Sequence, residues 1–321
     1  MNKAKQPSIE PIIQVRDLVK RYKKAKQNAV DGISFDVMPG EFFAFLGPNG
    51  AGKTTTISIL TTTLAQTSGN VTIAGYDLDK QSKKVRQSVG IIFQNPSLDL
   101  DLTAEENIRL HAGLYGEFTF MPTYSLMPES YKHKVKELTS LVGLENDLFK
   151  SMKTFSGGMK RKLEIVRSLM HEPKVLFLDE PTSGLDPISR RDVWQYLQKV
   201  RRERGTTIFL TTHYLDEAEG ADRVCVMNKG KVLSVGTPRD IKHQIAEEFI
   251  LLDAENRTEL RKELEVAGSE ILESKPHFKV RIQGSEKAQK LIAGIRTPLI
   301  ILQVNLPSLE DAYIKLVKEE A

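Results

Sequence analysis

The sequence contains very little cysteine. Cys225 is the only thiol among 321 residues, which excludes a framework of disulfide bonds. It lies in the apolar run Val224–Met227, where a buried structural thiol is the expected form. We therefore expect a protein suited to a reducing compartment such as the cytosol, rather than a small secreted scaffold.

Long hydrophobic runs and a strong net charge are missing too. No stretch approaches the roughly 18 uninterrupted apolar residues of a membrane-spanning helix, and residues 1–11 lack the apolar core of a secretory signal. We therefore expect neither a membrane span nor a cleaved signal peptide. The chain has 46 Lys and Arg against 42 Asp and Glu, a net charge of +4 that is too small to indicate a nucleic-acid partner. Its length allows two domains.

The strongest motif is the loop Gly47–Thr54, which has the spacing G-x-x-x-x-G-K-[ST]. The apolar run Phe42–Leu46 before it predicts a buried strand, and a helix is expected after it. The three glycines of the loop let backbone N–H groups turn around a phosphate. Lys53 supplies charge for the outer phosphates, and the Thr54 hydroxyl is placed for Mg²⁺. The alternative, a glycine-rich turn with a solvated lysine, does not explain the order of strand, loop and helix.

A second motif is the segment Lys174–Pro181. Its apolar residues predict a strand buried on both faces, so that Asp179 emerges at the carboxyl edge of the sheet, where α/β proteins bind ligands. The Asp179 carboxylate can hold Mg²⁺ through its water shell, and Glu180 can act as general base toward an attacking water. An acidic pair that merely solvates a loop is the alternative, which the phosphate loop makes the weaker one.

Three other positions are candidate functional residues, although none of them indicates a function by itself. Gln94, at the end of the predicted strand Ser88–Phe93, can contact Mg²⁺ and orient water; by itself it is a polar residue entering a loop. Ser156 and two following glycines predict a capped helix start that can approach an anion, as an ordinary helix start also can. His213 follows the predicted strand Thr207–Thr212 and can donate to a γ-phosphate, but a lone histidine is usually structural.

The remaining pattern predicts a mixed α/β chain. A capping Thr103 begins a mostly helical region that ends near Leu148. Within it, the segment Gly116–Ser130 breaks the helical period and carries several apolar residues; it either folds back on its own domain or is held for a partner. Further expected elements are strands at Ile12–Val19, Ile33–Met38 and Val71–Gly75, and helices at Thr54–Ala65 and Arg190–Arg204.

Residues 245–321 predict a separate small domain. Their pattern reads strand, helix, strand, strand, helix, strand, helix, with boundaries at Phe249–Leu252, Arg257–Ala267, Ile271–Glu273, His277–Ile282, Ser285–Ala293, Leu299–Val304 and Pro307–Lys318. This order fits a ferredoxin-like α+β module. We interpret it as an accessory domain that adjusts dimer contacts or regulates the first domain.

Taken together, the motifs resemble the ATP-binding subunit of an ABC transporter. They occur in the family's order over residues 10–240: aromatic A-loop Tyr22, Walker A Gly47–Thr55, Q-loop Gln94, signature Phe155–Met159, Walker B Val175–Asp179 with Glu180, D-loop Ser183–Asp186 and switch histidine His213. The resemblance implies an α/β P-loop ATPase core in residues 1–240, with an antiparallel β subdomain, a helical subdomain at about 97–172, and the accessory domain at 245–321.

The resemblance also implies a mechanism in which two copies face head to tail and enclose ATP. It assigns catalysis to Glu180, His213 and Gln94, and Mg²⁺ binding to Thr54, Gln94 and Asp179. It assigns ATP binding to Tyr22 stacked on the base, Val30 beneath the ribose, the loop residues Gly47, Pro48, Asn49, Gly50, Ala51, Gly52, Lys53, Thr54 and Thr55, and, from the partner, Phe155, Ser156, Gly157 and Gly158, with Asp186 of the D-loop. The signature departs from the commonest form LSGGQ at Phe155 and Met159, so the usual glutamine is replaced by a methionine.

A narrower resemblance is to the subfamily that serves ABC-2-type exporters of drugs, sodium or antibiotics. It lies in the runs Phe155–Arg161, Thr211–Glu219 and Leu306–Ile314. It implies a separately encoded membrane permease as partner, a homodimer or heterodimer of ATPase subunits, and a place on the inner face of the cell membrane. A soluble ABC ATPase that acts on ribosomes or DNA is the alternative, but this chain has neither two cassettes nor a coiled-coil insertion. A nucleotide-gated module without catalysis would require a missing base, and Glu180 is present.

Overall fold

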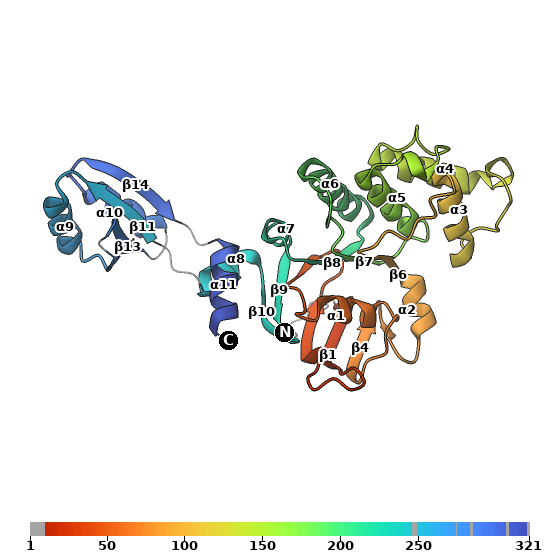
Figure 1. The fold of residues 1–321 in the computed structure, drawn as a ribbon, viewed down its shortest axis with the longest axis horizontal. Helices are drawn as coiled ribbons and strands as arrows, with labels where there is room; N and C mark the ends of the chain where they lie inside the picture. Colours follow the sequence, from red (N-terminus) through yellow and green to blue (C-terminus); the bar gives the residue numbers. More distant parts are fainter. Residues whose placement is uncertain (1–9, 246–248, 274, 283–284, 306–307, 320–321) are drawn as a thin grey trace, which may run out of the picture. The chain divides into compact units, whose positions relative to one another are not determined.

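A computed structural model describes residues 10–245, 249–273, 275–282, 285–305 and 308–319. The chain divides into two compact units, residues 1–237 and 238–321 (Figure 1). The first unit has two sheets, the second has one, and each unit has its own core. No helix among the described residues is both long and apolar enough to cross a bilayer.

The first unit is built on a six-stranded sheet with the order β10-β9-β3-β8-β7-β6. All neighbouring strands are parallel except the last pair, β9 and β10, which is antiparallel. Every residue of β3, β7 and β8 is buried, because helices and a second sheet cover both faces. The strands are β3 (Phe42–Leu46), β6 (Val89–Ile92), β7 (Val175–Asp179), β8 (Thr207–Thr212), β9 (Arg223–Asn228) and β10 (Lys231–Gly236).

A four-stranded sheet with the order β2-β1-β4-β5 packs against this central sheet, and its strands are antiparallel. Aromatic rings fill the space between the two sheets: the Phe35 ring lies 5.7 Å from that of Phe43, 5.4 Å from that of Phe45 and 6.1 Å from that of Phe209. The buried apolar residues of the two sheets thus form one common core. The strands are β1 (Ile13–Lys20), β2 (Val30–Val37), β4 (Ser68–Ile73) and β5 (Tyr76–Asp77).

Three helices lie within the helical subdomain predicted at about residues 97–172: α3 (Ala104–Tyr115), α4 (Glu129–Val142) and α5 (Gly157–Leu169). The predicted start at Thr103 is confirmed, because its side chain and that of Glu106 cap each other's backbone N–H groups. Short 3₁₀ turns occur at Tyr124–Leu126 and Met152–Thr154. The other helices of this unit are α1 (Lys53–Leu60), α2 (Ser82–Ser88), α6 (Pro187–Arg204) and α7 (Leu215–Glu219). Together with the two sheets, these helices confirm the predicted α/β class.

The segment Gly116–Ser130 is in part folded back on its own domain. The Phe118 ring lies edge-on to that of Tyr131 at 5.4 Å, and Met127 is buried. Phe120 and Leu126 stay exposed. The segment is therefore anchored at some apolar positions and presents others to its surroundings.

The second unit has a four-stranded antiparallel sheet with the order β12-β13-β11-β14. Leu260 and Leu264 of one helix pack with Ile250 and Leu252 of the sheet in a separate core. The chain order β11-α9-β12-β13-α10-β14 and this strand order are those of a ferredoxin-like module. The elements are β11 (Phe249–Ala254), α9 (Arg257–Val266), β12 (Ile271–Glu273), β13 (Phe278–Arg281), α10 (Ser285–Gly294) and β14 (Leu299–Asn305), flanked by α8 (Pro238–Ile245) and α11 (Leu309–Glu319). Of the predicted boundaries, Pro307 lies outside the described residues, as do residues 246–248, 274, 283–284, 306 and 320–321 of the predicted domain.

Candidate active site

The site lies where three neighbouring parallel strands end. Leu46 at the end of β3 pairs with Thr212 at the end of β8, and Asp179 at the end of β7 pairs with Thr211. Because the carboxyl ends of parallel strands meet at one edge of a sheet, the phosphate loop after β3, His213 after β8 and the acidic pair after β7 lie side by side at this edge. The predicted meeting of these motifs is thus a direct result of strand order and register.

The glycines of the phosphate loop are required by its backbone. Gly50 has φ +81° and Gly52 has φ +106°, values that side chains rarely allow. A Cβ on Gly52 would lie 2.4 Å from the carbonyl oxygen of Ala29, and a Cβ on Gly47 would lie 2.3 Å from that of Met227. The loop therefore passes against its own protein backbone with no room for larger residues.

Lys53 begins helix α1 and its side chain is buried, with 5% of its surface exposed. Its Nζ donates to the carbonyl oxygens of Gly47 at 2.7 Å and Pro48 at 3.2 Å, and lies 3.7 Å from Glu180 Oε1. Burial lowers the pKa of Lys53, against the opposing effect of the Glu180 and Asp179 carboxylates. An ammonium group buried at the mouth of a glycine loop fits an anionic ligand such as a polyphosphate.

Asp179 is held by two hydroxyl groups. Thr211 Oγ1 donates to Asp179 Oδ1 at 2.5 Å, and Thr54 Oγ1 donates to the same oxygen at 3.4 Å. Carboxylate and hydroxyl oxygens are ligands that Mg²⁺ accepts. No cluster of three or more His, Cys, Asp or Glu side chains suited to a metal occurs in the described part of the chain. The donor set therefore fits a Mg²⁺ that takes few ligands from the protein and the rest from phosphate and water.

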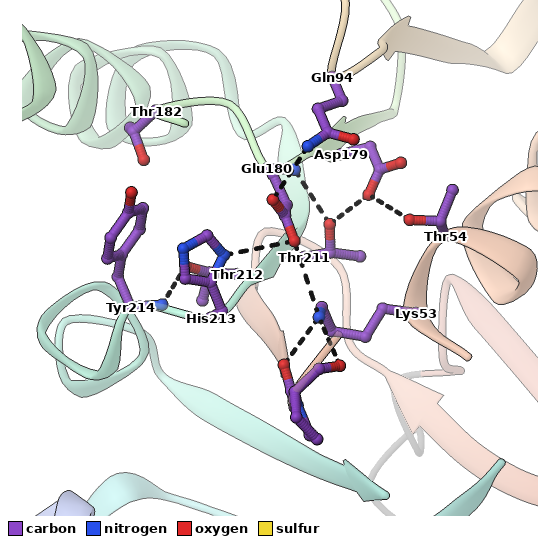
Figure 2. Close-up of polar contacts among 12 residues, drawn as sticks. Lys53, Thr54, Gln94, Asp179, Glu180, Thr182, Thr211, Thr212, His213 and Tyr214 are labelled. Atoms are coloured by element: carbon purple, nitrogen blue, oxygen red, sulfur yellow. Dashed lines mark hydrogen bonds and ion pairs between the residues drawn. The ribbon is translucent and has the colours of Figure 1, made fainter. Parts of the chain in front are cut away.

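The Glu180 carboxylate is the centre of the site (Figure 2). Gln94 Nε2 donates to its Oε2 at 3.2 Å, while His213 Nδ1 lies 3.4 Å and Lys53 Nζ 3.7 Å from its Oε1. The residue has φ +46°, and its backbone N–H donates to the carbonyl and the hydroxyl of Thr211 at 3.2 and 3.0 Å. Such a backbone conformation is rare for a glutamate and is typical of residues placed for function.

An open cleft of about 630 Å³ contains these groups. Two of its residues, Ala29 and Ser183, were not among the candidates from the sequence, although Ser183 lies in the predicted D-loop. Val30, predicted beneath a ribose, is fully buried in the core, so its neighbour Ala29 faces the cleft instead. The lining is Ala29, Asn49, Gly50, Ala51, Gly52, Lys53, Thr54, Thr55, Gln94, Glu180, Ser183 and His213.

Tyr22 lies beside the same loop although it is far from it in the sequence. Its hydroxyl is 3.3 Å from Thr55 Oγ1, and 46% of the residue is exposed. Lys20 Nζ lies 5.5 Å from the centre of its ring. The ring is therefore partly exposed beside the phosphate loop, a position from which it could stack on a base.

The predicted signature residues do not line this cleft. Ser156 caps α5 by accepting from the backbone N–H of Met159 at 3.2 Å, as predicted, and Phe155 is buried. A Cβ on Gly158 would lie 2.8 Å from Ser189 Oγ, so the start of α5 approaches α6 closely. Asp186 caps α6 by accepting from the backbone N–H groups of residues 188 and 189. A hydrogen bond with the Ser189 side chain, followed by these backbone hydrogen bonds, lowers the pKa of Asp186. These residues gather at a second place on the cassette.

A charged ladder on α5, which the sequence did not reveal, holds the segment after β6. Arg161 donates to the carbonyl oxygens of Phe93 and Gln94 at 2.8 and 2.9 Å, and Glu164 accepts from the N–H of Ser97 at 2.8 Å. Arg167 donates to the carbonyl of Ser97 at 2.9 Å. The spacing i, i+3, i+6 is the signal that could have shown it, because three charges on one helical face with buried neighbours need partners.

Comparison with known families gives a match to the ABC transporter family over residues 30–183. The probable multidrug ABC transporter ATP-binding protein YbhF of Escherichia coli strain K12 is 39% identical over 237 residues, which are 74% of this chain but only 39% of that protein. The daunorubicin/doxorubicin resistance ATP-binding protein DrrA of Streptomyces peucetius is 35% identical over 96% of this chain and 93% of its own length. The Nod factor export ATP-binding protein I of Burkholderia pseudomallei strain K96243 is 35% identical over 98% and 99%.

Solved structures show the same fold. The structure of cbiO1 from Clostridium perfringens, part of the ABC transporter complex cbiONQ, matches 72% of this chain and 90% of its own, with 30% identity and a TM-score of 0.64. The dimeric ATP-binding cassette MJ0796 bound to ADP and Pi matches 70% of this chain and 98% of its own, with 26% identity and a TM-score of 0.61.

Proposed function

Because this chain belongs to the ATP-binding proteins of ABC transporters, we propose that it binds ATP in the cleft around Lys53 and hydrolyses it to drive an exporter. The observation that carries the proposal is the position of Glu180 at the edge of the sheet, between the loop lysine and His213. A buried ammonium and glycine N–H groups suit the phosphates, and a carboxylate beside them suits the water that attacks.

In this proposal each side chain has a separate task. Lys53 and the loop N–H groups bind the phosphates, and Tyr22 stacks on the base. Glu180 accepts the proton of the attacking water, while Gln94 and His213, which both contact its carboxylate, orient the water and the γ-phosphate. Thr54, Asp179 and Gln94 would hold Mg²⁺, which neutralises developing negative charge on the phosphates when it is bound.

A dimer of cassettes is part of the proposal. Ser156, Gly157 and Gly158 lie outside the cleft of their own chain, and Ser156 is exposed at the start of α5, where its helix dipole favours an anion. We infer that they contact ATP bound to the loop of a second subunit, identical or closely related. The solved relative MJ0796 is dimeric. Two subunits would then enclose the nucleotide that neither encloses alone.

The remaining parts of the proposal concern the transporter. Relatives are named for multidrug transport, drug resistance and Nod factor export, so an ABC-2-type exporter is the expected assembly. The membrane path would belong to a separate permease, and the chain would lie at the cytoplasmic face of the membrane through that permease. Residues 245–321 would act as an accessory domain on the cassette.

The test is the Glu180→Gln variant, which keeps the shape of the side chain but cannot take up a proton. We expect ATP turnover to fall by about 10²- to 10⁴-fold while ATP binding is kept, and an ATP-dependent dimer to accumulate. Turnover is measured by phosphate release, ATP binding by calorimetry, and mass by light scattering after gel filtration.

The matched control is Glu203→Gln, an exposed glutamate in α6, which should behave as the unchanged protein. Turnover of Glu180→Gln at the unchanged rate would refute the assignment of the base. Loss of ATP binding in that variant would instead show that Glu180 serves mainly to form the cleft.

A further inference from the structure

A buried carboxylate, that of Glu217 in α7, joins the two segments that carry Glu180 and His213. Only 4% of Glu217 is exposed. The hydroxyl of Thr182 donates to its Oε1, and the hydroxyl of Thr212 donates to its Oε2 at 2.6 Å. Both threonines are buried. One side chain therefore bridges the turn after β7 and the turn after β8.

The Thr212 side of the bridge fixes the backbone around the histidine. Besides donating to Glu217, Thr212 Oγ1 accepts from the backbone N–H of Tyr214 at 2.9 Å (Figure 2). The Tyr214 ring lies 4.1 Å from the His213 ring and 4.0 Å from the guanidinium carbon of Arg190. The direction of the imidazole thus depends on a turn that the Thr212 hydroxyl closes.

The Thr182 side of the bridge fixes the turn that follows the base. Thr182 comes two residues after Glu180, in a turn where the N–H of Ser183 donates to the carbonyl of Glu180 at 3.1 Å and the N–H of Leu185 donates to the carbonyl of Thr182 at 3.1 Å. Displacement of Thr182 would shift the backbone from which the Glu180 side chain extends.

We propose that Glu217 is a positioning residue for ATP hydrolysis, which holds His213 in place against Glu180 by accepting hydrogen bonds from Thr182 and Thr212 at the same time. The proposal rests on the proposed function, since it concerns the same reaction. Glu217 is not among the residues that line the cleft. Burial raises the pKa of Glu217, so keeping a charge there costs free energy that an apolar residue of similar size would not.

The first experiment compares Glu217→Ala with Glu217→Gln. The alanine variant removes both hydrogen bonds, and we expect kcat to fall by about 10- to 100-fold while KM for ATP changes less than about twofold, because the cleft itself is kept. The glutamine variant can accept from one threonine and donate to the other, so its kcat should lie within about fivefold of the unchanged protein. The control is Asp216→Asn, an exposed neighbour on the same helix, which should leave both constants unchanged.

A double-mutant cycle with His213→Ala separates positioning from general structure. If Glu217 acts through the histidine, Glu217→Ala should add no further loss of single-turnover rate in the His213→Ala background. A loss that adds in full would refute the proposal, as would a folded Glu217→Ala protein with unchanged kcat or with a rise in KM alone. Folding is checked by calorimetry.

Should Glu217→Ala fail to fold, the variants Thr182→Val and Thr212→Val replace it. Each removes one side of the bridge, so the proposal expects the double variant to lose about as much rate as the worse single one, and independent, additive losses refute it. The Glu180→Gln protein distinguishes the two levels of failure. If that variant stops turnover while the bridge variants have no effect, only the positioning role fails; if it does not, the assignment of the reaction fails first.

Discussion

Two histidines of the helical region lie beside one tyrosine. The Tyr115 ring is 4.6 Å from the ring of His111 and 4.0 Å from that of His171. Burial, together with the smaller effects of the nearby Arg167 guanidinium and His171, lowers the pKa of His111 to about 3. In the folded protein His111 is therefore neutral at every pH at which the protein is usually handled.

This gives the first prediction at the residue scale, a sensitivity to acid. Below about pH 6.5 the unfolded chain binds a proton at His111, whereas the folded chain does so only near pH 3, so the free energy of unfolding must fall as pH drops through this window. Calorimetry between pH 7 and pH 4 should show a shallower fall of Tm for His111→Gln. His133→Gln, at an exposed position of α4, is the control that should keep the original slope. An unchanged slope in His111→Gln would contradict the expectation.

Single residues differ in how far the sequence could predict them. The spacing of the glycine loop is enough to place Lys53 and Thr54, because backbone geometry at a phosphate demands those residue types. The contact of His213 with Glu180 depends on β7 and β8 being neighbours in the sheet. The order of the motifs suggests this pairing, whereas the secondary-structure propensities of the residues do not. The role of Glu217 could not be predicted from the sequence, because a glutamate in a charged run usually faces water and only the structure shows that it is buried.

At the scale of elements, α5 joins the signature turn to the segment around Gln94. Arg161 and Glu164 are both buried and form an ion pair at 2.9 Å while each also binds that segment. Burial raises the pKa of Glu164 and lowers that of Arg161, and each is opposed by its partner's charge. Either charge, buried without its partner, would strongly destabilise the folded protein.

The second prediction concerns this ladder. Glu164→Ala leaves Arg161 buried without its carboxylate, and we expect the free energy of unfolding to fall by about 3–5 kcal/mol. Urea denaturation followed by circular dichroism measures it. Lys162→Ala on the same helix breaks only an exposed contact with Asp192, so it should change stability by less than about 1 kcal/mol. Equal losses of unfolding free energy in the two variants would show that the buried ion pair stabilises the protein no more than the exposed one does.

Element boundaries show where sequence patterns fail. The helix after the phosphate loop was predicted to reach Ala65 but ends at Leu60. Three threonines follow, and Thr61 Oγ1 donates back to the carbonyl of Ile57 at 2.8 Å while Thr62 adopts φ +62°. Hydrogen bonds from the threonine hydroxyls to nearby backbone carbonyls compete with the hydrogen bonds of a longer helix. The spacing of apolar residues does not show this competition, so the pattern predicted a helix that was too long.

At the scale of the whole molecule, the proposed mechanism uses two separate places on the cassette to contact ATP: the cleft around Lys53 and the exposed turn at Ser156. The proposed dimer brings together one of each from different chains. Sequence could suggest this only through family resemblance, because no pattern within one chain tells which surfaces meet between two.

The third prediction tests this arrangement by mixing two inactive proteins. Lys53→Ala removes the phosphate cation, and Ser156→Arg blocks the turn. A mixed dimer keeps one intact composite site, so an equal mixture should recover about a quarter of the unchanged turnover if the sites act independently. Phosphate release from each protein alone and from the mixture measures it. No recovery in a mixture that forms dimers would mean that each chain works with its own residues only.

The burial of the sole thiol has a practical consequence. Cys225 is fully buried in β9, and burial raises the pKa of its thiol well above the usual range. Maleimide reagents, which react with accessible thiolates, should therefore not label it. A cysteine introduced on the exposed surface of either unit can then be labelled with a fluorophore or spin probe without first removing the native one. Distances between labels on two subunits can thus be followed through a cycle of nucleotide addition in an otherwise natural background.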